Sequence, residues 1–82
     1  MLTLFILDTP EFKPILHTAR LAGMEIHHQD DYYEATSSEP EVVLERRHTD
    51  VRPSIWFAAL TGGLLGSIVQ FDHDRLCLRA SE

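Results

Sequence analysis

Residues 2–23, LTLFILDTPEFKPILHTARLAG, decide the fold because a strand signal runs directly into a helix signal. Residues 2–7 are a short apolar run that a polar turn at 8–10 ends, which is typical of a buried β-strand. Apolar side chains then recur at helical spacing, at Phe12, Ile15, Leu16, Ala19 and Ala22. Gly23 suits the position just after a helix. The stretch therefore predicts a strand at 2–7 and an amphipathic helix at 10–22.

The rest of the chain continues as short strands with one more helix. The predicted strands are 24–28, 32–36, 41–47, 66–71 and 75–79, and the helix is 55–60 after Pro53. The three middle strands should form a meander, and the last two a hairpin around 72–74. We expect one α+β domain over residues 1–82, with order β-α-β-β-β-α-β-β. It would be one mostly antiparallel sheet with two helices on one face. The sequence itself shows no internal repeat.

Size and charge favour a binding module over an enzyme. With 82 residues, the chain has little room for an enclosed active site. Its 13 acidic and 7 basic residues give a net charge of −6, which disfavours nucleic acid and anionic membranes as partners. The most apolar stretch, 55–69, is too short and broken to span a bilayer, and no signal peptide is evident. The single cysteine, Cys77, excludes a disulfide within the chain and favours the cytoplasm.

No arrangement of residues points to catalysis or a cofactor. The five histidines (His17, His27, His28, His48 and His73) lack the short paired spacings of zinc ligands, so we expect no metal site. Cys77 lies between two leucines, as a buried and inert thiol would. Residues 62–66, GGLLG, follow a helix and precede a strand, the reverse of a phosphate loop. We therefore name no catalytic residue and no cofactor.

The segment 55–65, IWFAALTGGLL, is apolar at every position from 55 to 60. A helix that is apolar all round must be covered on more than one side, and a sheet covers only one. Two interpretations follow. Either the only tryptophan lies in the core of a small protein, or part of this segment contacts another chain. The candidate contact residues are Trp56, Phe57, Leu64 and Leu65.

Arg46, Arg47 and Arg52 form the only basic cluster in the sequence. They can be a solvated strand end facing the acidic residues Glu41, Glu45 and Asp50. They can also be contacts to a partner protein, since arginine is enriched in interfaces. All three arginines are therefore candidate partner-binding residues.

The order of motifs resembles the small effector (coupling) proteins of soluble di-iron monooxygenases. These are the regulatory components of methane, phenol, toluene and propane monooxygenases. Residues 26–36, IHHQDDYYEAT, resemble the turn and aromatic strand of that family, and 42–46, VVLER, its next strand. Val51-Arg52-Pro53 is similar to a Gly-Arg-Pro that opens a helical region, although here valine replaces the glycine. Residues 66–69, GSIV, with Asp72 and 76–78, LCL, resemble its closing strands.

The resemblance spans nearly the whole chain through spacing and residue type, and the segment 53–66 is shorter than in the family. It implies an α+β fold, no cofactor, no catalytic residue, and binding to a di-iron hydroxylase. Two alternatives stay open. One is a dimeric ferredoxin-like protein or small enzyme whose pocket is lined by Tyr32, Tyr33, Trp56 and histidines. The other is a homodimeric structural module that self-associates through 55–65.

Overall fold

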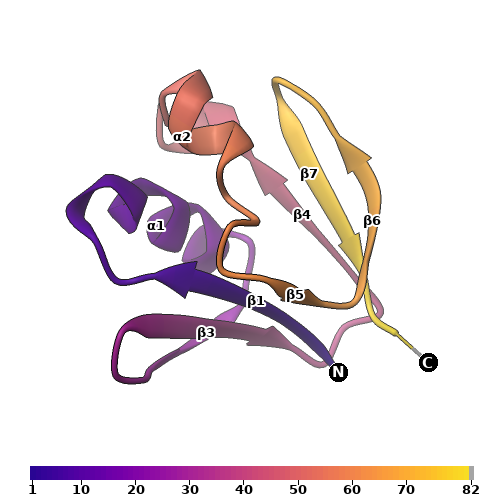
Figure 1. Cartoon of the computed structure of the whole chain (residues 1–82). Helices are drawn as coiled ribbons and strands as arrows, with labels where there is room; N and C mark the ends of the chain where they lie inside the picture. Colours follow the sequence, from indigo (N-terminus) through magenta and orange to yellow (C-terminus); the bar gives the residue numbers. More distant parts are fainter. Residues whose placement is uncertain (82) are drawn as a thin grey trace.

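The chain folds as two antiparallel sheets with two helices, in the computed structural model that describes residues 1–81 (Figure 1). The first sheet has the order β2-β3-β1-β5, and the second has the order β4-β7-β6. The strands are β1 (Leu2–Leu7), β2 (Glu25–His28), β3 (Tyr32–Ser37), β4 (Glu41–Glu45), β5 (Leu64–Leu65), β6 (Ser67–Phe71) and β7 (Arg75–Arg79). The helices are α1 (Lys13–Leu21) and α2 (Pro53–Phe57), with 3-10 turns η1 (Pro10–Phe12) and η2 (Arg46–His48). The α+β class is confirmed.

The first half of the chain is a β-α-β-β unit. β1 pairs along its whole length with β3, and β3 pairs with β2 in a hairpin. Helix α1 contacts β2 and β3. It ends at Leu21, and Gly23, just after the cap residue Ala22, has a φ of 90°, the positive value expected after a helix. The predicted strand at 2–7 and helix at 10–22 are confirmed, with η1 forming the first turn of that helix.

The second half repeats this topology. β4 pairs with β7, and β7 pairs with β6 in the predicted hairpin, so the first strand of each half again meets the last. The order β1-β3-β2 in one sheet thus corresponds to β4-β7-β6 in the other. The sequence shows no repeat, because different side chains fill the equivalent positions of the two units.

The predictions of a single sheet and of a three-strand meander are wrong. The chain leaves the first sheet at residues 38–40. The strand that follows, β4, belongs to the second sheet and pairs with β7, near the C-terminal end of the chain. Alternation in a strand determines which face is buried, but it does not select the neighbouring strand. Two short helices could not cover a single sheet of seven strands, whereas two sheets cover each other's inner faces.

The core lies between the two sheets and is completed by the helices. Each inner face contributes alternate strand residues, and α1 lies against strands of both sheets. The buried strand residues include Leu2, Leu4 and Ile6 of β1, Ala35 of β3, Val42 and Leu44 of β4, and Leu76 and Leu78 of β7. Ile15, Leu16 and Ala19 of α1 fill the space between the sheets.

Gly66 forms the corner where the chain crosses from the first sheet to the second. Its φ is 149°, a conformation that side chains rarely adopt. A Cβ atom there would lie 2.5 Å from Cδ1 of Leu2 and 2.8 Å from the carbonyl oxygen of Arg79. Only glycine fits this crossing, which places β5 beside β1 and β6 beside β7 (Figure 1).

Candidate docking surface

Trp56 belongs to the core, so its assignment as a partner-binding residue is wrong. Its side chain is 0% exposed, and its indole N–H donates a hydrogen bond of 2.7 Å to the backbone carbonyl of Asp72. The ring also meets Phe71 edge to face, with centroids 6.1 Å apart. A side chain without exposed surface cannot contact another chain. Trp56 instead joins α2 to the turn of the β6–β7 hairpin.

Phe57, the next residue, points outward and is 51% exposed. It contacts Phe71 of β6 at a centroid distance of 5.4 Å. Helix α2 ends here, sooner than the predicted end at Leu60, because Ala58, Ala59 and Thr61 form tight i→i+3 bonds instead of continuing the helix. Adjacent helical residues point in different directions, so one aromatic ring is buried while the other is exposed.

Leu64 and Leu65 of β5 also differ in environment. Leu64 lies opposite Leu4 and packs partly into the core. Leu65 lies opposite Thr3 on the other face of the sheet and is 59% exposed. Of these two candidates, Leu65 is the one whose side chain remains accessible.

Strand β6 adds exposed apolar residues that the sequence analysis did not single out. Ile68 and Val69 are 50% and 47% exposed. β6 is the edge of its sheet, and its outer side has no partner strand among residues 1–81. A register shift between Ile68 and Gln70 places a bulge at Val69. The absence of any charged residue from 67 to 71 was the sequence signal for this surface.

We call Phe57, Leu65, Ile68 and Val69 the apolar edge. They are four of the seven large hydrophobic side chains that are exposed in residues 1–81, and they occur within one stretch of chain. Proteins normally protect edge strands with charged side chains. β4 and β2 follow that pattern, since β4 has Glu41 and Glu45 and β2 has Glu25. β6 does not, and neither does β5, the two-residue edge of the first sheet, so β6 is the longer of the two uncharged edges.

The three candidate arginines lie in different environments. Arg46 is half-buried, and its guanidinium donates to the carbonyl oxygens of His73 at 2.6 Å and Val51 at 2.8 Å. It therefore fastens η2 to the β6–β7 turn and to the loop before α2. Arg47 is exposed and lies 3.1 Å from the carboxylate of Glu45. Arg52 is exposed and immediately precedes α2.

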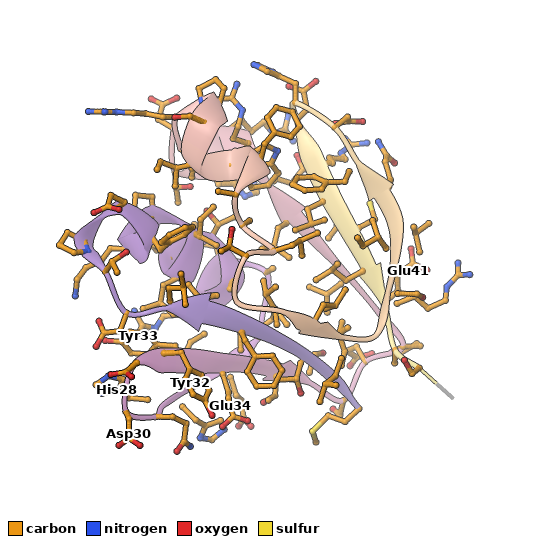
Figure 2. All side chains as sticks on the ribbon, viewed as in Figure 1. His28, Asp30, Tyr32, Tyr33, Glu34 and Glu41 are labelled. Carbon is orange, nitrogen blue, oxygen red and sulfur yellow. The ribbon has the colours of Figure 1, made fainter. Side chains whose placement is uncertain are left out.

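The histidines and aromatic strand residues do not line a common pocket with Trp56. Tyr32 contacts Phe5 on the outer face of the first sheet, beside a hollow of about 260 Å³. Tyr33 and His28 lie beside each other (Figure 2), with stacked rings whose centroids are 4.4 Å apart. His28 Nε2 also lies 2.9 Å from Oδ2 of Asp8. Within residues 1–81, no group of three or more His, Cys, Asp or Glu side chains is arranged to hold a metal ion.

The hairpin turn at 72–74 is held by Asp72. Its carboxylate accepts hydrogen bonds from the side-chain amide of Gln70 and from the backbone N–H groups of Asp74 and Arg75. These bonds, that of Gln70 first, hold the pKa of Asp72 below its ordinary value of 3.8. The aspartates here serve turn geometry. Cys77 is buried, as predicted, with its thiol 3.9 Å from Oε1 of Gln70.

No helix in residues 1–81 is long and apolar enough to cross a membrane. Comparison of the chain with protein-family models, curated protein sequences and solved structures finds no match.

Proposed function

We propose that this chain is a non-catalytic effector, or coupling, protein that docks on the hydroxylase of a multicomponent di-iron monooxygenase in the cytoplasm. The apolar edge is the observation that carries the proposal. Phe57 contacts Phe71 of β6, and Ile68 and Val69 belong to the same strand, so three large apolar side chains are exposed on or beside one unpaired edge, which favours a binding role. The resemblance of residues 26–78 to effector proteins of such oxygenases gives the class of partner.

The apolar edge offers two kinds of contact at once. Phe57, Ile68 and Val69 present side chains that a hydrophobic groove can bury, and aromatic residues such as Phe57 are enriched in interfaces. β6 presents free backbone N–H and C=O groups along its outer side, to which a strand of a partner can hydrogen-bond. The two helices and the paired strands keep this surface rigid, which lowers the entropic cost of docking.

Such docking needs no catalytic group on this chain. A protein that binds one state of the hydroxylase better than another shifts the population toward that state. A tenfold change in the equilibrium between two states requires a difference of about 1.4 kcal/mol in binding free energy. Loss of two exposed apolar anchors is enough to remove an effect of this size.

The test is to mix the purified chain with the co-encoded hydroxylase, and to measure both binding and the fraction of reducing equivalents that yields product. We expect binding and a rise in coupled turnover. Phe57→Ser combined with Ile68→Ser should weaken binding at least about tenfold. Leu21→Ser is the matched control, because Leu21 is 55% exposed on α1, outside the apolar edge. Absence of binding, or unchanged turnover with bound protein, contradicts the proposal.

Self-association through the same edge is a second candidate, favoured by the uncharged strand β6. Two copies that each have a net charge of −6 repel each other over most of their surfaces. Strand β6 has no charged side chain, so two β6 strands can approach each other without this repulsion. Antiparallel pairing of β6 with its copy would join the two second sheets into one. Light scattering over a range of concentrations tests this candidate. A dimer that Val69→Lys dissociates would support it, whereas a monomer at every concentration would reject it.

A further inference from the structure

A second surface, independent of the apolar edge, lies between the first half of α1 and the turn η2. There the side chains surround an open hollow of about 550 Å³. Its lining residues are Lys13, Pro14, His17, Arg47, His48, Thr49 and Asp50. We call this surface the basic hollow, because Lys13, His17, Arg47 and His48 are four side chains that can carry positive charge.

The charge of this hollow is opposite to that of the molecule. The whole chain carries −6, yet the hollow contains a single acidic residue, Asp50. Arg47 has a partner in Glu45, but that carboxylate also accepts a hydrogen bond of 2.7 Å from Arg75. Asp72 and Asp74 also lie beside Arg75, so the positive charge that faces the hollow comes from Lys13 and from Arg47, which shares its carboxylate partner with Arg75. Lys13, His17 and His48 are all exposed.

Partly buried hydrogen bonds hold the floor of the hollow in place. The Thr18 hydroxyl bonds to the carbonyl of Pro14 at 2.8 Å and to the hydroxyl of Thr49, which ties α1 to the loop after η2. The backbone N–H groups of Thr49 and Asp50 both donate to the carbonyl of Arg46. Asp50 has a φ of 53°, a left-handed conformation that its neighbours maintain. The cationic side chains therefore project from a preorganised frame.

We propose that the basic hollow docks an acidic segment of a partner protein. Arg47 and Lys13 suit carboxylates, which form charge-assisted hydrogen bonds with both groups. Nucleic acid fits less well, because a phosphate backbone needs a track of cations beyond one hollow, and the rest of this acidic surface repels it. The site is separate from the apolar edge, so this inference does not depend on the proposed oxygenase partner.

In the test, a hexaglutamate peptide is titrated into the full chain in about 20 mM salt. Two-dimensional amide NMR spectra record which residues change their chemical shifts. We expect shifts centred on residues 13–17 and 47–50, no shifts with hexaglutamine, and loss of binding in about 0.5 M salt. The paired variant Lys13→Gln/Arg47→Gln should weaken binding roughly 3- to 10-fold. The variant Arg20→Gln/Arg79→Gln removes the same charge from residues outside the hollow, leaves the Glu45 carboxylate with both of its partners, and should keep the affinity within about twofold.

One variant should act in the opposite direction. Asp50→Asn removes the only carboxylate of the hollow, and asparagine tolerates a left-handed conformation as well as aspartate does. We expect this variant to bind hexaglutamate roughly 2- to 5-fold more tightly. The proposal would be overturned if both double variants weakened hexaglutamate binding equally. It would also be overturned if the NMR shifts centred on residues other than 13–17 and 47–50. Tighter binding of a decathymidylate oligonucleotide than of the peptide would also overturn it, in favour of nucleic acid.

Discussion

Trp56 and Phe57 are adjacent in sequence, and their opposite environments determine their roles. The Trp56 side chain is buried and hydrogen-bonded, whereas the Phe57 side chain lies on the surface. The sequence analysis grouped them because an unbroken apolar run does not indicate which side of a short helix is covered. At the scale of single residues, the Trp56 ring stabilises the fold, whereas the Phe57 ring is the one that stays accessible for the proposed docking.

Trp56→Phe should destabilise the protein by about 1–3 kcal/mol. The change leaves a small cavity and removes the indole N–H that bonds the Asp72 carbonyl from within the core. Urea unfolding monitored by far-UV circular dichroism measures the effect, since the variant lacks tryptophan fluorescence. Phe57→Ser is the comparison and should change stability by less than about 1 kcal/mol. Equal losses in both variants would contradict the placement of the two rings.

Asp72→Asn should destabilise the protein at neutral pH, with a difference that shrinks as the pH falls below about 3.8. The folded protein holds the pKa of Asp72 below the unfolded value, so its carboxylate stabilises the fold above that value. This contribution is lost as the pH falls through the lower, folded pKa. Unfolding free energies measured across pH 2–7 test the sign.

The hydrogen bond from Gln70 is the largest cause of this pKa shift. In a Gln70→Ala background, the pH-dependent stability difference caused by Asp72→Asn should therefore be smaller. A difference that grows as the solution is acidified would show that the carboxylate does not stabilise the turn.

At the scale of elements, the corner at Gly66 determines how the two sheets meet. Gly66→Ala should destabilise the protein by about 2–3 kcal/mol, because backbone strain adds to the overlap with Leu2 and with the Arg79 carbonyl. Gly23→Ala is the matched control. Gly23 also has a positive φ, but its missing Cβ would meet no atom within 4 Å, so only the strain of about 1 kcal/mol applies. Thermal unfolding should rank the variants in this order.

The elements were easier to predict than their partners. The order of strands and helices followed from apolar spacing and from turn residues such as Pro10, Gly23 and Pro53, and only the two-residue β5 was missed. The pairing of β4 with β7 was not predicted, because strand alternation contains no information on neighbours. Ile68 and Val69 are exposed because β6 lies at the edge of its sheet. β6 is at the edge because β7 pairs with β4 on its other side, and this pairing was not predicted.

At the scale of the whole molecule, the two candidate surfaces have complementary character. The apolar edge belongs to α2, β5 and β6, whereas the basic hollow belongs to α1 and η2. The enrichment of arginine in interfaces suggested three arginines as contacts, but Arg46 holds the fold together and, of the three, only Arg47 lines the basic hollow. The histidines at 17 and 48 acquire a shared location only in the folded chain, which explains why their spacing in the sequence was uninformative.

The matching strand order of the two halves means that the protein should reassemble from fragments. A break between Ser38 and Glu39 leaves each sheet with its own three paired strands, and only the short β1–β5 ladder joins strands of different fragments. Each fragment alone would expose the inner face of its sheet to water, so neither should fold by itself. Co-expressed fragments 1–38 and 39–82 should therefore form a soluble heterodimer whose amide spectrum resembles that of the intact chain. Its dissociation constant would report directly how strongly the core between the halves holds them together.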